Sequence, residues 1–127
     1  MKRTPLRRKS KSPNAKIVAA ADALWAKIVK DRAGGLCEKC GKPGSDAHHM
    51  VSRRYRYLRH ELANGVYLCK GCHLNFHSKE SLSLWAWMQV NRPKDFNFVN
   101  DFVNEPFPKG KAADDYAKLV EIANEMD

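Results

Sequence analysis

The chain has 127 residues and a formal net charge of +9 at pH 7. This length fits one domain with a small core, and the excess of positive charge favours a polyanionic partner such as nucleic acid. No run of residues approaches the ~18 apolar side chains of a membrane span, and the basic start contains no apolar signal-peptide core. We therefore expect an intracellular protein without a membrane segment.

The positive charge is concentrated in the first part of the chain. Residues 1–70 carry 17 Lys and Arg against 5 Asp and Glu, whereas residues 71–127 carry 6 against 9. Residues 1–12 alone hold six basic and no acidic side chains, which predicts a flexible basic tail. The tail could contact phosphates, act as an import signal, or be inert. The N-terminal half should form the surface that faces phosphate.

The first predicted helix follows this tail. Ser12 before Pro13 is typical of an N-cap with proline at the first helical position, and Gly34-Gly35 ends the pattern. Apolar residues recur at helical spacing between these signals. Trp25 lies beside this stripe, and we expect it in the core.

A metal module is expected over residues 36–78, followed by a helical extension over residues 79–127. Within the module we predict strands over 47–52 and 65–68 and a short helix from about residue 72. A further helix should end at residues 91–93, residues 94–111 should be irregular, and a last amphipathic helix should surround residues 116–123. The fold class is therefore α+β and mostly helical, as a single domain over residues 13–127.

The four cysteines form two Cys-x-x-Cys pairs, and no thiol is left over. They are Cys37, Cys40, Cys69 and Cys72. Disulfides would be an alternative in a secreted protein, but in an intracellular one such pairs more often hold a metal. The spacing predicts a closed, structural zinc site of four thiolates.

The histidines could be ligands of a second metal site. His73 and His77 are spaced i, i+4, so on a helix they share one face and can chelate one ion. Cys72 and His73 are adjacent and diverge by roughly 100° on a helix, so they should serve different ions. His48 and His49 point to opposite faces of a strand. One of them can join His73 and His77, and the other can act as a general base.

These residues resemble the HNH nuclease family, whose motif is a ββα-metal finger. The order is His48-His49, then Asn64, then His73 with His77. Asn64 follows His49 by 15 positions, and His73 follows Asn64 by 9. The gaps are similar to those of the nuclease colicins. The surrounding cysteine pairs and the basic start resemble the zinc-stabilised branch of bacteriophage and bacterial proteins, which implies the cytoplasm of a bacterium or a phage-infected host.

The resemblance implies a metal-dependent DNA endonuclease that leaves 3′-hydroxyl and 5′-phosphate ends. His49 would be the general base, and His48, His73 and His77 would hold a divalent ion (Mg²⁺, Mn²⁺, Ni²⁺ or Zn²⁺). Asn64 would belong to the catalytic set as a structural residue that bridges backbone groups and presents His49. The zinc held by the cysteines would be structural.

The loop between the two strands departs from the pattern of many family members, because it is basic and aromatic. We expect Arg53 and Arg54 to contact the nucleic acid, with Arg56 and Arg59 as weaker candidates; each could instead pair with Glu61 or face solvent. The alternative functions are a non-catalytic zinc module that binds nucleic acid, as in phage recombination or regulation, and a zinc scaffold for a protein partner.

Overall fold

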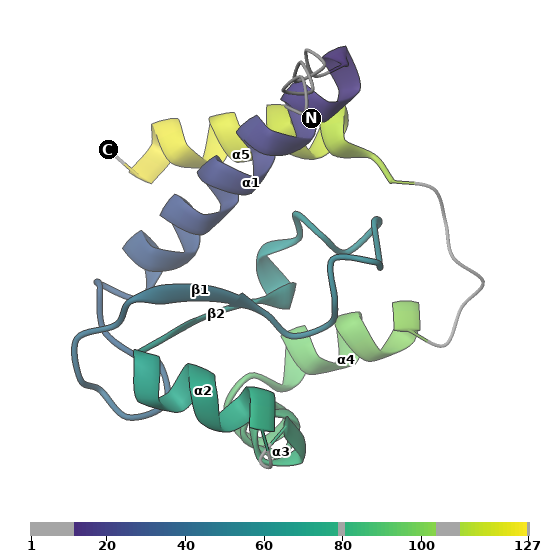
Figure 1. Ribbon diagram of the computed structural model, residues 1–127. Helices are drawn as coiled ribbons and strands as arrows, with labels where there is room; N and C mark the ends of the chain where they lie inside the picture. Colours follow the sequence, from purple (N-terminus) through teal and green to yellow (C-terminus); the bar gives the residue numbers. More distant parts are fainter. Residues whose placement is uncertain (1–11, 79–80, 104–109, 127) are drawn as a thin grey trace, which may run out of the picture.

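The computed structural model describes residues 12–78, 81–103 and 110–126, without the side chains of residues 77, 78 and 81. Its elements are α1 (Pro13–Arg32), β1 (Asp46–His49), the short 3-10 helix η1 (Leu62–Asn64), β2 (Gly65–Leu68), α2 (Lys70–Ser78), α3 (Ser81–Asn91), α4 (Pro93–Val103) and α5 (Ala112–Met126) (Figure 1). The predicted α+β, mostly helical fold is confirmed. The basic tail predicted over residues 1–12 lies, apart from Ser12, outside the described residues.

The first helix begins and ends where the sequence predicts. The Ser12 hydroxyl accepts a hydrogen bond from the backbone N–H of Ala15 at 3.2 Å, and Pro13 is the first helical residue. After Arg32 the chain turns through Gly34 and Gly35, which have φ angles of 65° and 75°. Residues with a Cβ rarely adopt this left-handed backbone conformation, so the glycine pair explains why the helix ends here.

The two strands form an antiparallel hairpin in which Asp46 pairs with Leu68 and His49 with Gly65. β2 has the predicted limits, but β1 stops at His49, three residues earlier than expected. The physical reason is a change of partner. The next two backbone N–H groups bond to the backbone carbonyl and then to the side-chain Oδ1 of Asn64, at 2.8 and 2.9 Å, instead of extending the ladder.

The hairpin separates two hydrophobic clusters because side chains alternate along β2. Val66 and Leu68 lie in a cluster with buried residues of α2, α3 and α4, such as Met88. Tyr67 lies in a second cluster with α1 and α5, which includes Trp25 and Leu119. In Figure 1, α1 and α5 lie above the hairpin and α2 lies below it. Each face of the hairpin therefore packs against a different set of helices.

The C-terminal extension corrects one prediction. The segment 94–111 was expected to be irregular, but residues 93–103 form α4. Pro93 at the first position and Asp95 in the first turn favour a helix start, and Phe96, Val99 and Phe102 recur at helical spacing on its packed side. The helices α3 and α5 match their predictions, and α2 begins two residues before residue 72. Residues 104–109 lie outside the described part.

Candidate metal centre and active site

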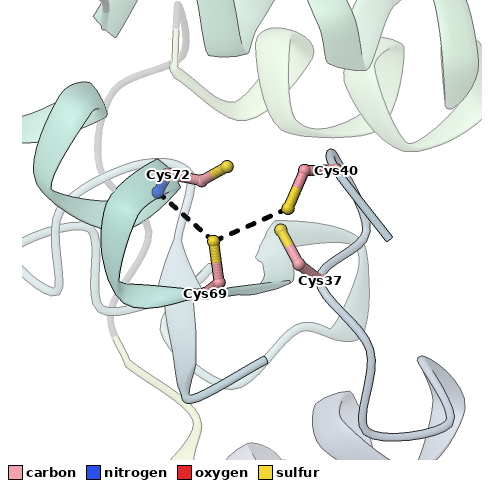
Figure 2. A group of neighbouring side chains, drawn as sticks. All are labelled: Cys37, Cys40, Cys69 and Cys72. Carbon is pink, nitrogen blue, oxygen red and sulfur yellow. Dashed lines mark hydrogen bonds between the residues drawn. The ribbon is translucent and has the colours of Figure 1, made fainter. Parts of the chain in front are cut away.

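The four cysteine thiols converge on one point between the loop after α1 and the start of α2 (Figure 2). Their sulfur atoms all lie within 4.8 Å of one another, and the Cys40 and Cys69 sulfurs are 3.6 Å apart. A tetrahedral zinc site with bonds of ~2.3 Å places its sulfurs about 3.8 Å apart. Among the described residues, this is the one group of three or more Cys, His, Asp or Glu side chains whose ligand atoms lie so close together. The donor set and its spacing fit a structural zinc ion.

Backbone N–H groups favour the thiolate form, which binds metal, at Cys37 and Cys69. Burial raises the pKa of the Cys37 thiol, but hydrogen bonds from the backbone of Cys40, Cys69 and Lys39 outweigh it and bring that pKa to about 6. The N–H of Cys72 likewise points at the Cys69 sulfur, at 3.5 Å. Such donors are the usual outer shell of a thiolate site.

Glu38, inside the first Cys-x-x-Cys turn, ties this turn to the hairpin. Its Oε2 accepts a hydrogen bond from the backbone N–H of Tyr67 at 2.6 Å. Arg32 and Arg92 lie within 3.8 and 3.7 Å of its carboxylate, and both donate to the carbonyl of Gly65, at 2.9 and 2.7 Å. The cluster is thus held in a fixed position relative to the β1–β2 hairpin.

On the other side of α2's first turn, His73 meets residues of β1. The His48 and His73 rings approach edge-on, with centroids 4.9 Å apart. His73 Nδ1 lies 3.0 Å from Asp46 Oδ2. A carboxylate at one ring nitrogen fixes the tautomer and leaves the other nitrogen for a metal. His48 and His73 therefore have the chemistry and proximity to share an ion, whereas the side chain of His77 lies outside the described residues.

His49 points to the opposite face of β1, toward α1. Its ring stacks on Trp25, with centroids 4.0 Å apart and an interplanar angle of 9°. Its Nε2 lies 2.9 Å from the backbone carbonyl of Arg59. Because a carbonyl only accepts, Nε2 carries the proton and Nδ1 has the lone pair. Burial, assisted by the charge of Arg53, lowers the pKa of His49 to about 4 although the Arg59 carbonyl opposes it, so the ring is neutral at pH 7.

Asn64 is fully buried and holds the two ends of the loop after β1. Its Oδ1 accepts from the N–H of Val51 at 2.9 Å, and its Nδ2 donates to the carbonyls of Leu58 and Val51 at 3.2 and 3.4 Å. All three hydrogen bonds are buried, where polar groups rarely go without a partner. Asn64 therefore shapes the loop that begins directly after His49.

The loop arginines differ in their surroundings. Arg53, Arg54 and Arg56 are exposed. Arg59 is half-buried, and its guanidinium binds both carboxylate oxygens of Asp22, at 2.9 and 2.6 Å. Arg56 and Arg59 also line an open groove of about 750 Å³ against the start of α1. The exposed arginines are thus available to an anion, whereas Arg59 is already paired.

Two members of this site were absent from the sequence prediction. Asp46 lies two residues before His48, so the alternation of a strand places both on one face, and this signal was available. Trp25 was expected only in the core; it is buried there, 2% exposed, yet it also contacts His49. That contact joins residues 24 positions apart, and no local pattern indicates it.

No curated protein and no solved structure matched this chain. Among the residues that the structure describes, no helix combines the length and apolar character needed to cross a membrane. Residues 37–79 match the family model described as HNH endonuclease. This match indicates a nuclease or nucleic-acid-binding function, and it agrees with the predicted resemblance over these residues. The chain is thus similar to the HNH endonucleases over residues 37–79, and the four clustered cysteines fit the zinc-binding branch of that family.

Proposed function

We propose that this protein is a metal-dependent endonuclease that hydrolyses DNA phosphodiester bonds. The observation that carries the proposal is the contrast between two neighbouring histidines of β1. His48 lies against His73, whose Nδ1 contacts a carboxylate, while His49 lies against an indole and a backbone carbonyl. The first arrangement suits a metal ligand and the second suits a general base.

In the proposed reaction, His49 Nδ1 accepts a proton from water. The oxygen of that water forms a bond to phosphorus, and the bond from phosphorus to the 3′ oxygen breaks. The 3′ oxygen takes up a proton from solvent, so the products carry a 3′-hydroxyl and a 5′-phosphate. The carbonyl of Arg59 stabilises the imidazolium formed on His49, because Nε2–H remains its donor.

A divalent ion held by His48, His73 and His77 would supply charge stabilisation at the scissile phosphate and at the leaving oxygen. Asp46 orients His73 for that role through its 3.0 Å contact with Nδ1. Asn64 acts one step further away: its hydrogen bonds to Val51 and Leu58 fix the loop that starts beside His49.

The nucleic acid would approach the exposed side of this loop. Arg53 is close enough to His49 to influence its pKa, so a phosphate bound by Arg53 would lie near the proposed base. Arg54 is its exposed neighbour, and Arg56 faces the groove beside α1. Guanidinium groups bind phosphate oxygens in a bidentate manner. We therefore assign the principal backbone contacts to Arg53 and Arg54.

The test is cleavage of supercoiled plasmid by wild type and His49→Ala, each with Mg²⁺, Mn²⁺, Ni²⁺, Zn²⁺ or EDTA. Zinc content and circular dichroism must show that the variant keeps the cysteine site and the fold. We expect EDTA to abolish cleavage by wild type, and the variant to lose about 10²-fold or more in rate, the usual effect of removing a general base.

Binding of the same DNA, measured without divalent ions, distinguishes the alternatives. Equal binding by both proteins together with no cleavage of plasmid, single-stranded or branched DNA would favour the non-catalytic nucleic-acid-binding module. Absence of both binding and cleavage would favour a zinc scaffold for a protein partner. Cleavage by His49→Ala at the wild-type rate would leave the nuclease but remove His49 as its base.

A further inference from the structure

Trp25 lies on α1, outside the residues 37–79 that match the HNH family model. It is 2% exposed, and its indole covers one face of the His49 imidazole, with centroids 4.0 Å apart and planes 9° from parallel. A flat surface at this distance prevents the imidazole from rotating about its Cβ–Cγ bond. The stacked indole therefore fixes the plane in which the two ring nitrogens of His49 lie.

The indole of Trp25 also reaches the segment that binds the edge of the same imidazole. Its Nε1–H donates to the backbone carbonyl of Glu61 at 2.9 Å. Two residues earlier, the carbonyl of Arg59 accepts from His49 Nε2, also at 2.9 Å. One side chain thus contacts the face of the ring and, through two residues of backbone, holds the acceptor at its edge.

Asp22, three residues before Trp25 on the same face of α1, strengthens this arrangement. Its carboxylate accepts two hydrogen bonds from the Arg59 guanidinium, at 2.9 and 2.6 Å, and lies 2.7 Å from Nε2 of the buried His60. These hydrogen bonds hold residues 59 and 60 against the helix. The carbonyl that fixes the His49 tautomer belongs to the same short segment.

A glycine opposite His49 makes the close approach of α1 possible. Gly65 pairs with His49 across the hairpin, and a Cβ on it would lie 2.6 Å from Val29 Cγ2 and 2.8 Å from Trp25 Cζ2. Its backbone is extended, with φ −106° and ψ 142°, so the conformation itself does not require glycine. The restricted space requires glycine, because α1 packs directly on the backbone of the hairpin beside His49.

We infer that Trp25 is a positioning residue for His49: it fixes the plane of the imidazole and, together with Asp22, the carbonyl that holds its Nε2. The inference rests on the proposed role of His49 as general base. It makes α1 a required part of the active site rather than an appended helix. A tryptophan that only fills space would affect stability when replaced, whereas a positioning tryptophan affects the rate of the chemical step and the tautomer of His49.

The experiment compares wild type, Trp25→Phe, Trp25→Leu and the control Trp85→Leu. Trp85 packs against the other hydrophobic cluster, edge-on to Phe96. For each zinc-loaded protein we would measure the single-turnover cleavage rate at saturating plasmid, the DNA affinity without divalent ions, and the unfolding midpoint. Correlations between ring protons and nitrogens of ¹⁵N-labelled histidine report the tautomer of His49.

We expect Trp25→Leu to cleave about 10²-fold more slowly, the loss typical of a displaced catalytic group, with unchanged DNA affinity and a mixed His49 tautomer. Trp25→Phe keeps an aromatic face and should retain most of the rate, and Trp85→Leu should lose stability without this effect. If Trp25→Leu does not fold, Asp22→Asn takes its place in the same measurements, and it should also slow cleavage and mix the His49 tautomers, because it releases Arg59.

A folded Trp25→Leu that cleaves within twofold of Trp85→Leu, with His49 still in the Nε2–H form, would overturn the inference. If wild type cuts no DNA, the proposed function fails independently. The histidine spectra then decide alone whether Trp25 holds the imidazole, because they require no substrate.

Discussion

The carboxylate of Asp46 and the imidazole of His73 meet across the gap between β1 and α2, with Oδ2 and Nδ1 3.0 Å apart. The hydrogen bond from His73 lowers the pKa of Asp46, so the carboxylate is ionised at pH 7. An ionised carboxylate at Nδ1 orients the ring and raises the basicity of Nε2 toward a metal. The proposed ion site thus has an outer partner besides its histidine ligands.

Replacing Asp46 should therefore weaken divalent-ion binding without removing a proposed ligand. We expect Asp46→Ala to lower the affinity for Mn²⁺ or Ni²⁺ by about 10–100-fold, as measured by calorimetric titration of the zinc-loaded protein. Ser45→Ala, which removes the neighbouring hydroxyl contact to Asp46, is the matched control and should change the affinity little. An unchanged affinity in Asp46→Ala would show that His73 is oriented by other groups.

Asn64 should contribute to stability through the loop after β1. Asn64→Ala leaves the N–H of Val51 and the carbonyl of Leu58 without their side-chain partner. Because both groups are buried, we expect the free energy of unfolding to fall by about 2–3 kcal/mol. Urea titration followed by circular dichroism measures this loss. Asn97→Ala, at an exposed position of α4, should stay within about 0.5 kcal/mol of wild type.

The local parts of the fold were predictable because their signals are local. Ser12 and Pro13 mark the start of α1, the glycine pair marks its end, and β2 has its predicted limits. The four-cysteine cluster followed from spacing, since a Cys-x-x-Cys turn can place two sulfurs on one ion. In each case a few neighbouring residues decide the conformation.

The remaining features depend on contacts between distant residues. Residues 94–111 were expected to be irregular because they are rich in Asn, Phe and Pro. Residues 93–103 nevertheless form α4, since tertiary packing of Phe96 and Val99 overrides weak helix propensity. Arg59 was a weaker candidate for contact with the nucleic acid, and its guanidinium binds Asp22, 37 positions away. Neither the partner of Arg59 nor the stacking of Trp25 on His49 has a signature in nearby sequence.

Arg53 and Arg54 should account for much of the salt dependence of DNA binding. Each phosphate contact releases counterions, so losing two should reduce the slope of log affinity against log salt by about 2. We expect this for Arg53→Ala/Arg54→Ala in fluorescence-anisotropy titrations at several salt concentrations. Lys94→Ala/Lys118→Ala removes the same charge from exposed positions of α4 and α5. Equal slopes for the two double variants would place the DNA elsewhere.

The cysteine cluster should make folding dependent on zinc. The cluster connects the loop after α1 to the start of α2, and binding free energy at such a site is folding free energy. We expect one zinc per chain in the purified protein, and loss of helical circular dichroism when a strong chelator removes it. Cys69→Ser should bind zinc more weakly and unfold at a lower chelator concentration. A zinc-free protein that retains its fold would contradict this prediction.

Asp22 should stabilise the fold at neutral pH, and this contribution should be lost in acid. Burial raises the pKa of Asp22, but hydrogen bonds from Arg59 and His60 outweigh it, so the pKa lies below the ordinary value of an aspartate. A lowered pKa adds stability above the unfolded-state value, and this contribution is lost as pH falls through the folded-state value. Asp22→Asn should thus be less stable than wild type at pH 7, and the difference should shrink toward pH 3. Urea unfolding at both pH values measures this difference.

The exposed Asp31 on the same helix provides the control Asp31→Asn, which should change stability little. A difference between Asp22→Asn and wild type that is the same at both pH values would show that the carboxylate of Asp22 does not carry this acid sensitivity.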